Sequence, residues 1–120
     1  MSRRDDVTLL RDMLEAGRQA IASEQARGRE DLDRDLVWTW GLTKCLEIIG
    51  EAASRLSDEL HARSADIPWA QIIGMRNRLV HAYFEVDRDQ VWRTITEDLP
   101  PLVEQLERLL EAEEKRGFAK

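Results

Sequence analysis

Several residue types are scarce in this chain of 120 residues, and each scarcity excludes a class of structure. The single cysteine, Cys45, cannot form an internal disulfide, which fits a reducing compartment. Only three prolines and six glycines interrupt the chain. No apolar run has the length of a membrane span, and the first residues do not resemble a signal peptide. We therefore expect a cytoplasmic protein that forms one helical domain over residues 1–120 and has no membrane partner.

Positive charge is also in deficit, because 18 lysines and arginines face 24 acidic residues and leave a net charge of −6. Tight binding of nucleic acid usually needs a basic surface, so the overall charge argues against a protein that binds RNA. Four basic or titratable residues nevertheless cluster in one stretch of the chain: Arg76, Arg78, His81 and Arg88. A local site for a phosphate therefore remains possible in an acidic protein.

Apolar residues recur at helical spacing along most of the chain, and no segment alternates with a period of two. The pattern predicts helices over residues 4–26, 35–56, 68–84 and 88–115, with a kink or an interruption at Pro100-Pro101. Residues 27–35 read as a solvated loop, and residues 57–66 as a connection with one helical turn and a surface histidine, His61. Gly50, inside the second helix, indicates close approach of another helix. The fold class predicted is an all-α antiparallel bundle of four or five helices.

The third predicted helix contains a charge in an unusual place. If residues 68–84 form one helix, Arg76 lies in the middle of a wide apolar arc. A buried arginine needs a carboxylate or an anionic ligand, and Glu47 and Glu51 lie one turn apart on the preceding helix. We expect one of these two glutamates to reach and orient Arg76. The alternative is that both face water, with Glu51 paired to Arg55.

Arg76, His81 and Tyr83 follow the spacing R-x4-H-x-Y within the segment RNRLVHAY. Histidine titrates near neutral pH and transfers protons, while the guanidinium of arginine binds phosphate through a fork of donors. The two side chains lie about 140° apart on a straight helix and cannot easily point to one place. Either the helix loosens near its end, or a second copy of the chain supplies the other half of the site.

This motif resembles the HepT-like branch of the HEPN superfamily, the toxin half of HEPN–MNT toxin–antitoxin pairs. The segments LEIIGEAASRLS, IPWAQIIGMRNRLVH and VWRTITEDLPPL extend the resemblance over most of the chain, in the family's order. The one departure noted is Ala82, where glycine is expected.

The resemblance implies a homodimer that cleaves RNA in a cleft between its subunits, without a metal ion or another cofactor. Arg76 would hold the phosphate, His81 would act as acid and base, and Asn77 would orient the phosphate or His81. A partner nucleotidyltransferase of the MNT type would add AMP to Tyr83 and silence the toxin.

Each of these residues also has a purely structural interpretation: an ion pair for Arg76, a capped or surface position for His81, and a packed ring for Tyr83. Two other functions remain open. One is a non-catalytic helical module that binds a nucleotidyltransferase and is modified by it, which the net charge of −6 favours. The other is a bundle that binds a nucleotide or small ligand near Arg76.

Overall fold

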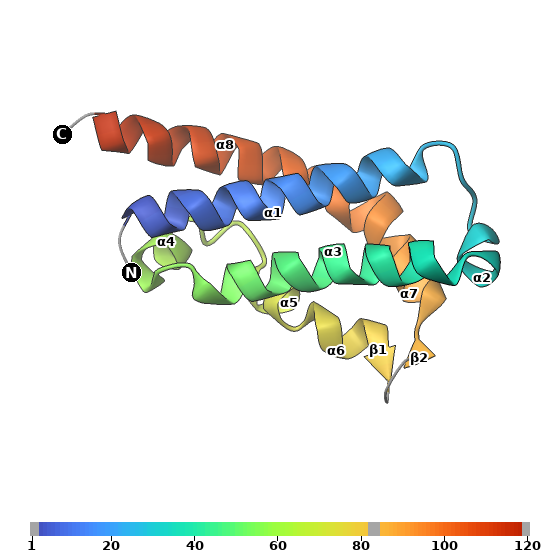
Figure 1. Ribbon diagram of the computed structural model, residues 1–120. Helices are drawn as coiled ribbons and strands as arrows, with labels where there is room; N and C mark the ends of the chain where they lie inside the picture. Colours follow the sequence, from blue (N-terminus) through green and yellow to red (C-terminus); the bar gives the residue numbers. More distant parts are fainter. Residues whose placement is uncertain (1–2, 82–84, 119–120) are drawn as a thin grey trace.

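Three long helices run side by side and form the body of the molecule (Figure 1). The computed structural model describes residues 3–81 and 85–118, in which these helices are α1 (Arg3–Glu24), α3 (Leu36–Arg55) and α8 (Leu99–Phe118). Helix α1 packs against both α3 and α8 and runs antiparallel to each. Their buried faces meet in one hydrophobic core. The predicted all-α bundle is confirmed.

Shorter elements close the ends and one side of this body. They are α2 (Asp31–Arg34), α4 (Asp58–Arg63), α5 (Trp69–Ile73), α6 (Met75–Leu79), β1 (Val80–His81), β2 (Glu85–Val86), α7 (Arg88–Arg93) and the π-helical turn η1 (Thr94–Asp98). The first two long helices end within two residues of their predicted limits, and α4 supplies the helical turn expected between residues 57 and 66.

The stretch 27–35 is more ordered than the expected loop. Leu32, on α2, is completely buried, and its carbonyl accepts a hydrogen bond of 2.7 Å from the hydroxyl of Thr39. The carboxylate of Asp35 then caps α3 by accepting a hydrogen bond from the backbone N–H of Trp38 at 3.0 Å. This bond, assisted by Arg27, lowers the pKa of Asp35. The expected solvated loop is thus wrong, because one leucine docks the segment on the core.

Gly50 allows α5 to approach α3 closely, as its position inside a helix predicted. A Cβ atom at Gly50 would lie 3.1 Å from the backbone carbonyl oxygen of Ile72. Any larger side chain would therefore push α5 away from α3. This close contact sets the position of the segment that carries Arg76.

The predicted helix over residues 68–84 is wrong in two places. It is divided at Gly74, a poor helix former, and it ends at Leu79. There the carbonyl of Leu79 accepts a hydrogen bond of 2.7 Å from the backbone N–H of Asp87, which brings the chain back on itself. Strands β1 and β2 pair antiparallel, with Val80 opposite Val86. The ladder is only two residues long, too short to show an alternating pattern in the sequence.

The last third of the chain begins with a capped helix and is interrupted near the prolines, as predicted for Pro100-Pro101. The carboxylate of Asp87 accepts a hydrogen bond from Gln90 N–H at 3.1 Å and begins α7. Proline has no N–H to bond the carbonyl four residues earlier, and the chain widens into the π-helical turn η1 just before Pro100 and Pro101. The helix then continues as α8 to Phe118, three residues beyond the predicted end.

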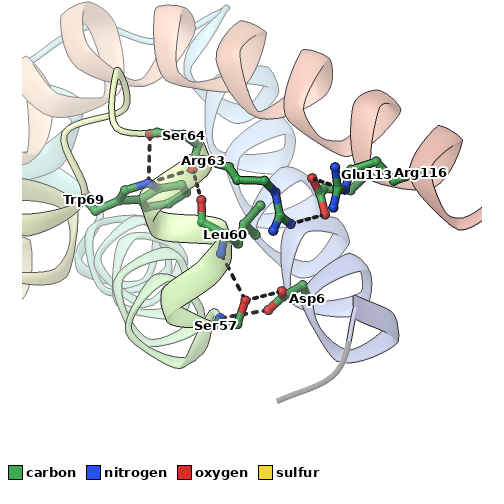
Figure 2. A network of polar contacts seen from close by, with 8 residues as sticks. All are labelled: Asp6, Ser57, Leu60, Arg63, Ser64, Trp69, Glu113 and Arg116. Carbon is green, nitrogen blue, oxygen red and sulfur yellow. Dashed lines mark hydrogen bonds and ion pairs between the residues drawn. The ribbon is translucent and has the colours of Figure 1, made fainter.

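Two buried carboxylates fix the end of the bundle where α1, α4 and α8 meet (Figure 2). Asp6 accepts hydrogen bonds from the backbone N–H and the hydroxyl of Ser57, at 2.9 and 2.6 Å. Glu113 accepts one from Arg63 at 2.8 Å. Both carboxylates are removed from water. The loss of a hydrogen-bond partner of either one would therefore lower the stability of the fold.

His61 and Cys45 are both half-buried and pack against other residues of the fold. His61 Nε2 lies 2.9 Å from the carbonyl oxygen of Ala53, and its ring packs on that of Trp69 with centroids 5.2 Å apart. His61, expected at the surface, is half-buried. Cys45 packs against the core, and burial raises the pKa of its thiol. Within the described ranges, no helix combines the length and the apolar character needed to cross a bilayer.

Candidate functional site

The side chain of Arg76 points outward from α6 and is 61% exposed. The break at Gly74 leaves only a narrow buried stripe on α5 and α6, and Ile73 is 40% exposed. The residues of that stripe are Trp69, Ile72, Met75 and Leu79. The predicted burial of Arg76 is therefore wrong, because it assumed one continuous helix. Its guanidinium is instead accessible to a ligand.

Glu47, on α3, holds Arg76 in the way the sequence suggested for one of the two glutamates. Arg76 Nε donates a hydrogen bond to Glu47 Oε2 at 3.1 Å. Among the described residues, no other hydrogen bond or ion pair engages this guanidinium, including its two terminal nitrogens. An exposed ion pair contributes only about 0–1 kcal/mol to stability. The contact therefore orients Arg76 more than it stabilises the fold.

Glu51 lies one turn further along α3 and does not share this role. It is exposed, and within the described part of the chain it forms no ion pair with Arg76 or Arg55. The alternative pairing of Glu51 with Arg55 is thus also not observed. Glu51 lines the same surface depression as Arg76 and adds a negative charge there.

Two depressions meet at the pair of Arg76 and Glu47. The first, which we call the helix groove, has a volume of about 490 Å³ and lies over α3 between α1 and α5–α6. The second, which we call the hairpin hollow, has a volume of about 370 Å³ and lies between α3, α6 and the two strands. The hairpin hollow is lined by Trp40, Thr43, Lys44, Glu47, Arg76, Val80 and Val86. Both volumes suit a small ligand or one unit of a polymer.

Arg78 and Arg88, two members of the basic cluster read from the sequence, do not line the depressions beside Arg76. Arg78 lines a different cavity, with Glu97 and Asp98. Arg88 lies 3.8 Å from Asp33, near α2. Asn77, the residue after Arg76, is exposed on α6. Of these arginines, therefore, only Arg76 lines the two depressions.

His81 and Tyr83 are only partly within reach of the structure. The backbone of His81 forms the end of β1 and pairs with Glu85 of β2. The side chain of His81 and the whole of Tyr83 and Ala82 lie outside the described residues. The roles expected for His81 and Tyr83 stay predictions. Strand β1 follows α6 directly and begins one residue after Leu79.

Two residues of the hairpin hollow were missed by sequence reasoning, namely Trp40 and Lys44. Trp40 lies two turns and Lys44 one turn before Glu47 on one face of α3, at the helical spacing i, i+4 and i+7. That spacing was visible in the sequence. It did not indicate a site, because the hairpin that forms one side of the hairpin hollow was not predicted.

No group of three histidine, cysteine, aspartate or glutamate side chains gathers as metal ligands within residues 3–81 and 85–118. Lys44 is exposed and forms no ion pair with any described residue. The chemical groups on offer at the site are therefore a lysine, an arginine fork, a carboxylate and an indole ring.

Comparison with known proteins gives consistent results. The sequence model of a family described as "Ribonuclease HepT-like" matches residues 9–109. A protein of Caldanaerobacter subterraneus subsp. tengcongensis named "Putative RNase" is 39% identical over 84 residues, which are 70% of this chain and 75% of the relative.

Two archaeal relatives extend the similarity. A "Probable ribonuclease HepT" of Thermococcus cleftensis is 38% identical over 80 residues, 67% of this chain and 73% of the relative. A "Putative RNase" of Methanocaldococcus jannaschii is 29% identical over 107 residues, 89% of this chain and 98% of the relative. No solved structure matches the chain significantly.

Proposed function

Because the chain belongs to the HepT-like ribonuclease family, we propose that it is an endoribonuclease and the toxin of a toxin–antitoxin pair in the cytoplasm. The observation that carries the proposal is the state of Arg76. Its side chain is 61% exposed, and Glu47 engages only its Nε atom. The two terminal nitrogens form the planar fork that binds a phosphate through two hydrogen bonds.

The residues offer a complete set of groups for cleavage without a metal ion. The 2′-hydroxyl of one nucleotide attacks the adjacent phosphorus as a base removes its proton, and the 5′-oxygen leaves with a proton from an acid. His81 supplies the base and the acid, Arg76 stabilises the charge on phosphorus, and Asn77 orients the phosphate or His81.

A homodimer supports this scheme better than a single chain. The chain has two histidines, and His61 is engaged by Ala53 and Trp69. One chain thus offers one histidine for two proton transfers. Two copies of His81 across a shared cleft would serve as acid and base in the same turnover.

Tyr83 is the proposed point of control. A partner nucleotidyltransferase would join the phenol oxygen of Tyr83 to the α-phosphate of ATP, releasing pyrophosphate and the phenol proton. The added phosphate would stand beside Arg76 and His81 and repel the RNA backbone. Incubation with the partner and ATP should add the mass of AMP to the wild type and not to Tyr83→Phe. Equal labelling of both proteins would remove Tyr83 from the scheme.

The ribonuclease proposal is tested by cleavage of a labelled RNA in the presence of a metal chelator. His81→Ala and Arg76→Gln should each lower the rate at least 100-fold. Arg18→Gln is the matched control, because Arg18 forms an exposed pair with Glu107 at 2.8 Å on α1 and α8. Cleavage by His81→Ala and Arg76→Gln at the rate of the wild type would overturn the proposal.

The competing function is a non-catalytic module that acts through its complex with the nucleotidyltransferase. The net charge of −6 favours it, since RNA is repelled by an acidic surface. Growth of cells that express wild type or His81→Ala separates the two. Arrest that persists with His81→Ala would favour the binding module over the ribonuclease.

A further inference from the structure

The helix groove contains two large apolar side chains that remain in contact with water. Ile48 of α3 is 37% exposed and Ile73 of α5 is 40% exposed, and both line this groove. Isoleucine is among the residue types most often fully buried, and covering these two side chains would remove apolar surface from water. Apolar surface that charged residues surround is typical of a contact between proteins.

The charged residues that line the helix groove sum to zero. The acidic ones are Asp12, Glu47 and Glu51, and the basic ones are Lys44, Arg55 and Arg76. The whole chain, by contrast, has a net charge of −6. Two copies of an acidic chain repel each other least where they meet through a neutral surface, because salt screens the more distant charges. A neutral groove also offers no electrostatic attraction to a polyanion such as RNA. The balance of charge therefore favours a second copy of the chain as its occupant.

Two of these charges have the arrangement that a two-fold contact requires. Lys44 lies four residues before Ile48 and Glu51 lies three residues after it, on one exposed face of α3. Neither Lys44 nor Glu51 forms an ion pair with any described residue. A rise of about 10 Å along the helix separates the two charges within one chain. An antiparallel copy of the same helix would bring each of them opposite a charge of the other sign.

We propose that two copies of the chain form the homodimer through the helix groove, with their α3 helices crossing antiparallel about a two-fold axis at Ile48. At a two-fold contact, a residue on the axis meets its own copy and every other contact occurs twice. Ile48 then packs on the partner's Ile48, and Lys44 of each copy lies beside the partner's Glu51. A parallel crossing is disfavoured because it would set Lys44 against the partner's Lys44. The inference rests on the homodimer of the proposed ribonuclease and assigns a surface to it.

This contact brings the arginine forks of the two copies to the axis. Arg76 lines both the helix groove and the hairpin hollow, and its Nε atom bonds Glu47, the residue before Ile48. The two Arg76 side chains would therefore lie on either side of the axis. The hairpin hollow extends from Arg76 toward β1 and stays outside the contact. The dimer would thus form one cleft with an arginine fork from each copy and a β1 strand at each side.

Reversal of the two charges tests the pairing, with the dimer Kd measured by sedimentation equilibrium. Lys44→Glu and Glu51→Lys should each raise Kd about tenfold or more, because symmetry turns each change into two contacts between like charges. The double variant Lys44→Glu/Glu51→Lys exchanges the charges and should bring Kd back to within about threefold of the wild type. This rescue separates a contact between subunits from damage to the fold.

Lys115→Glu is the matched control for Lys44→Glu, because it makes the same change in net charge at the far end of α8. Lys115 pairs with Glu111 at 3.0 Å and does not line the groove. Its Kd should equal that of the wild type.

Cross-linking tests the position of the axis. A disulfide needs two Cα atoms within about 7 Å, so a cysteine can bond its own copy only if it lies beside the axis. In a Cys45→Ala background, Ile48→Cys should form a covalent dimer on mild oxidation. Glu104→Cys in the same background should stay unlinked, because Glu104 is exposed on α8 and does not line the groove.

Four outcomes would overturn the contact. The first is a wild type that sediments as a monomer at every concentration, and the second is a dimer whose Kd both single charge reversals leave unchanged. The third is a double variant that dimerises no better than the single variants. The fourth is the absence of a covalent dimer after oxidation of Ile48→Cys.

Dilution separates this inference from the ribonuclease proposal. If both hold, the specific activity of the wild type falls below the dimer Kd, whereas the covalent Ile48→Cys dimer keeps its activity. A dimer that forms through the groove and cuts no RNA would remove the ribonuclease proposal and leave the contact. A wild-type monomer that cuts RNA would remove the contact and leave the ribonuclease activity.

Discussion

Two arginine–glutamate pairs, at different places in the same small molecule, have opposite physical characters. Arg63 and Glu113 join α4 to α8 at 2.8 Å, and the side chain of Glu113 is only 3% exposed (Figure 2). Arg76 and Glu47 join α6 to α3 at 3.1 Å, with side chains 61% and 32% exposed. The first pair keeps its carboxylate out of water, although Arg63 is 36% exposed, and the second lies in water beside two depressions.

The difference indicates what each pair can do. A carboxylate removed from water must keep its partner, so the contact of Glu113 is costly to break and unsuited to exchange. A pair in water contributes little to stability and can release a donor to another anion at small cost. The same two residue types therefore serve structure at one place and ligand binding at the other.

The largest expected effect is on activity at the exposed pair. Arg76→Gln should lower kcat/KM at least 100-fold, because the phosphate loses a charged fork in the transition state. Its free energy of unfolding should change by less than about 0.5 kcal/mol. Cleavage assays and urea denaturation measure the two quantities. A clear loss of stability in Arg76→Gln would erase the contrast between the two pairs.

The buried pair should show the reverse. Glu113→Ala leaves Arg63 without its carboxylate and opens space between α4 and α8, so the free energy of unfolding should fall by about 2–3 kcal/mol. At a temperature where the variant is folded, its rate of RNA cleavage should match the wild type. Urea denaturation and cleavage at that temperature provide the test. A variant as stable as the wild type would show that the buried pair contributes nothing.

The sequence was sufficient for the elements that local chemistry determines. Gly50 marks the close helix contact that its position inside a helix predicted. Apolar periodicity located α1, α3 and α8 to within a few residues. These features depend on neighbours along the chain, which a sequence displays directly.

Features that depend on distant parts of the chain were not predictable in this way. The helix stops at Leu79 because the N–H of Asp87 takes its carbonyl, a contact formed only when the chain turns back. The false burial of Arg76 followed from missing that turn and the break at Gly74. Likewise, Glu47 and Glu51 share a helix face, and only the three-dimensional structure distinguishes which one reaches Arg76.

A change in helix packing is expected to affect both the stability of the fold and the exposed pair on α6. Gly50→Ala places a Cβ atom 3.1 Å from the carbonyl oxygen of Ile72, so α5 and the attached α6 must shift. We expect a loss of about 1 kcal/mol in stability, since strain exceeds the gain in helix propensity, and a fall of about fivefold in kcat/KM.

Gly41→Ala is the matched control for this change. Gly41 lies on the same helix, and its Cβ would meet nothing within 4 Å. The substitution should raise stability by about 0.5–1 kcal/mol and leave the cleavage rate unchanged. If both alanine variants cleave RNA at the rate of the wild type, the position of α6 is not set by this contact.

The smallest effect is expected at Glu47, where it tests whether the exposed pair orients or merely accompanies Arg76. Glu47→Gln keeps an oxygen that accepts from Arg76 Nε, so kcat/KM should stay within about twofold of the wild type. Glu47→Ala removes that acceptor, frees the guanidinium to rotate, and should lower kcat/KM about threefold. Neither variant should lose more than about 0.5 kcal/mol of stability. Faster cleavage by both variants would mean that the carboxylate competes with phosphate for Arg76, and its role would then be inhibition rather than orientation.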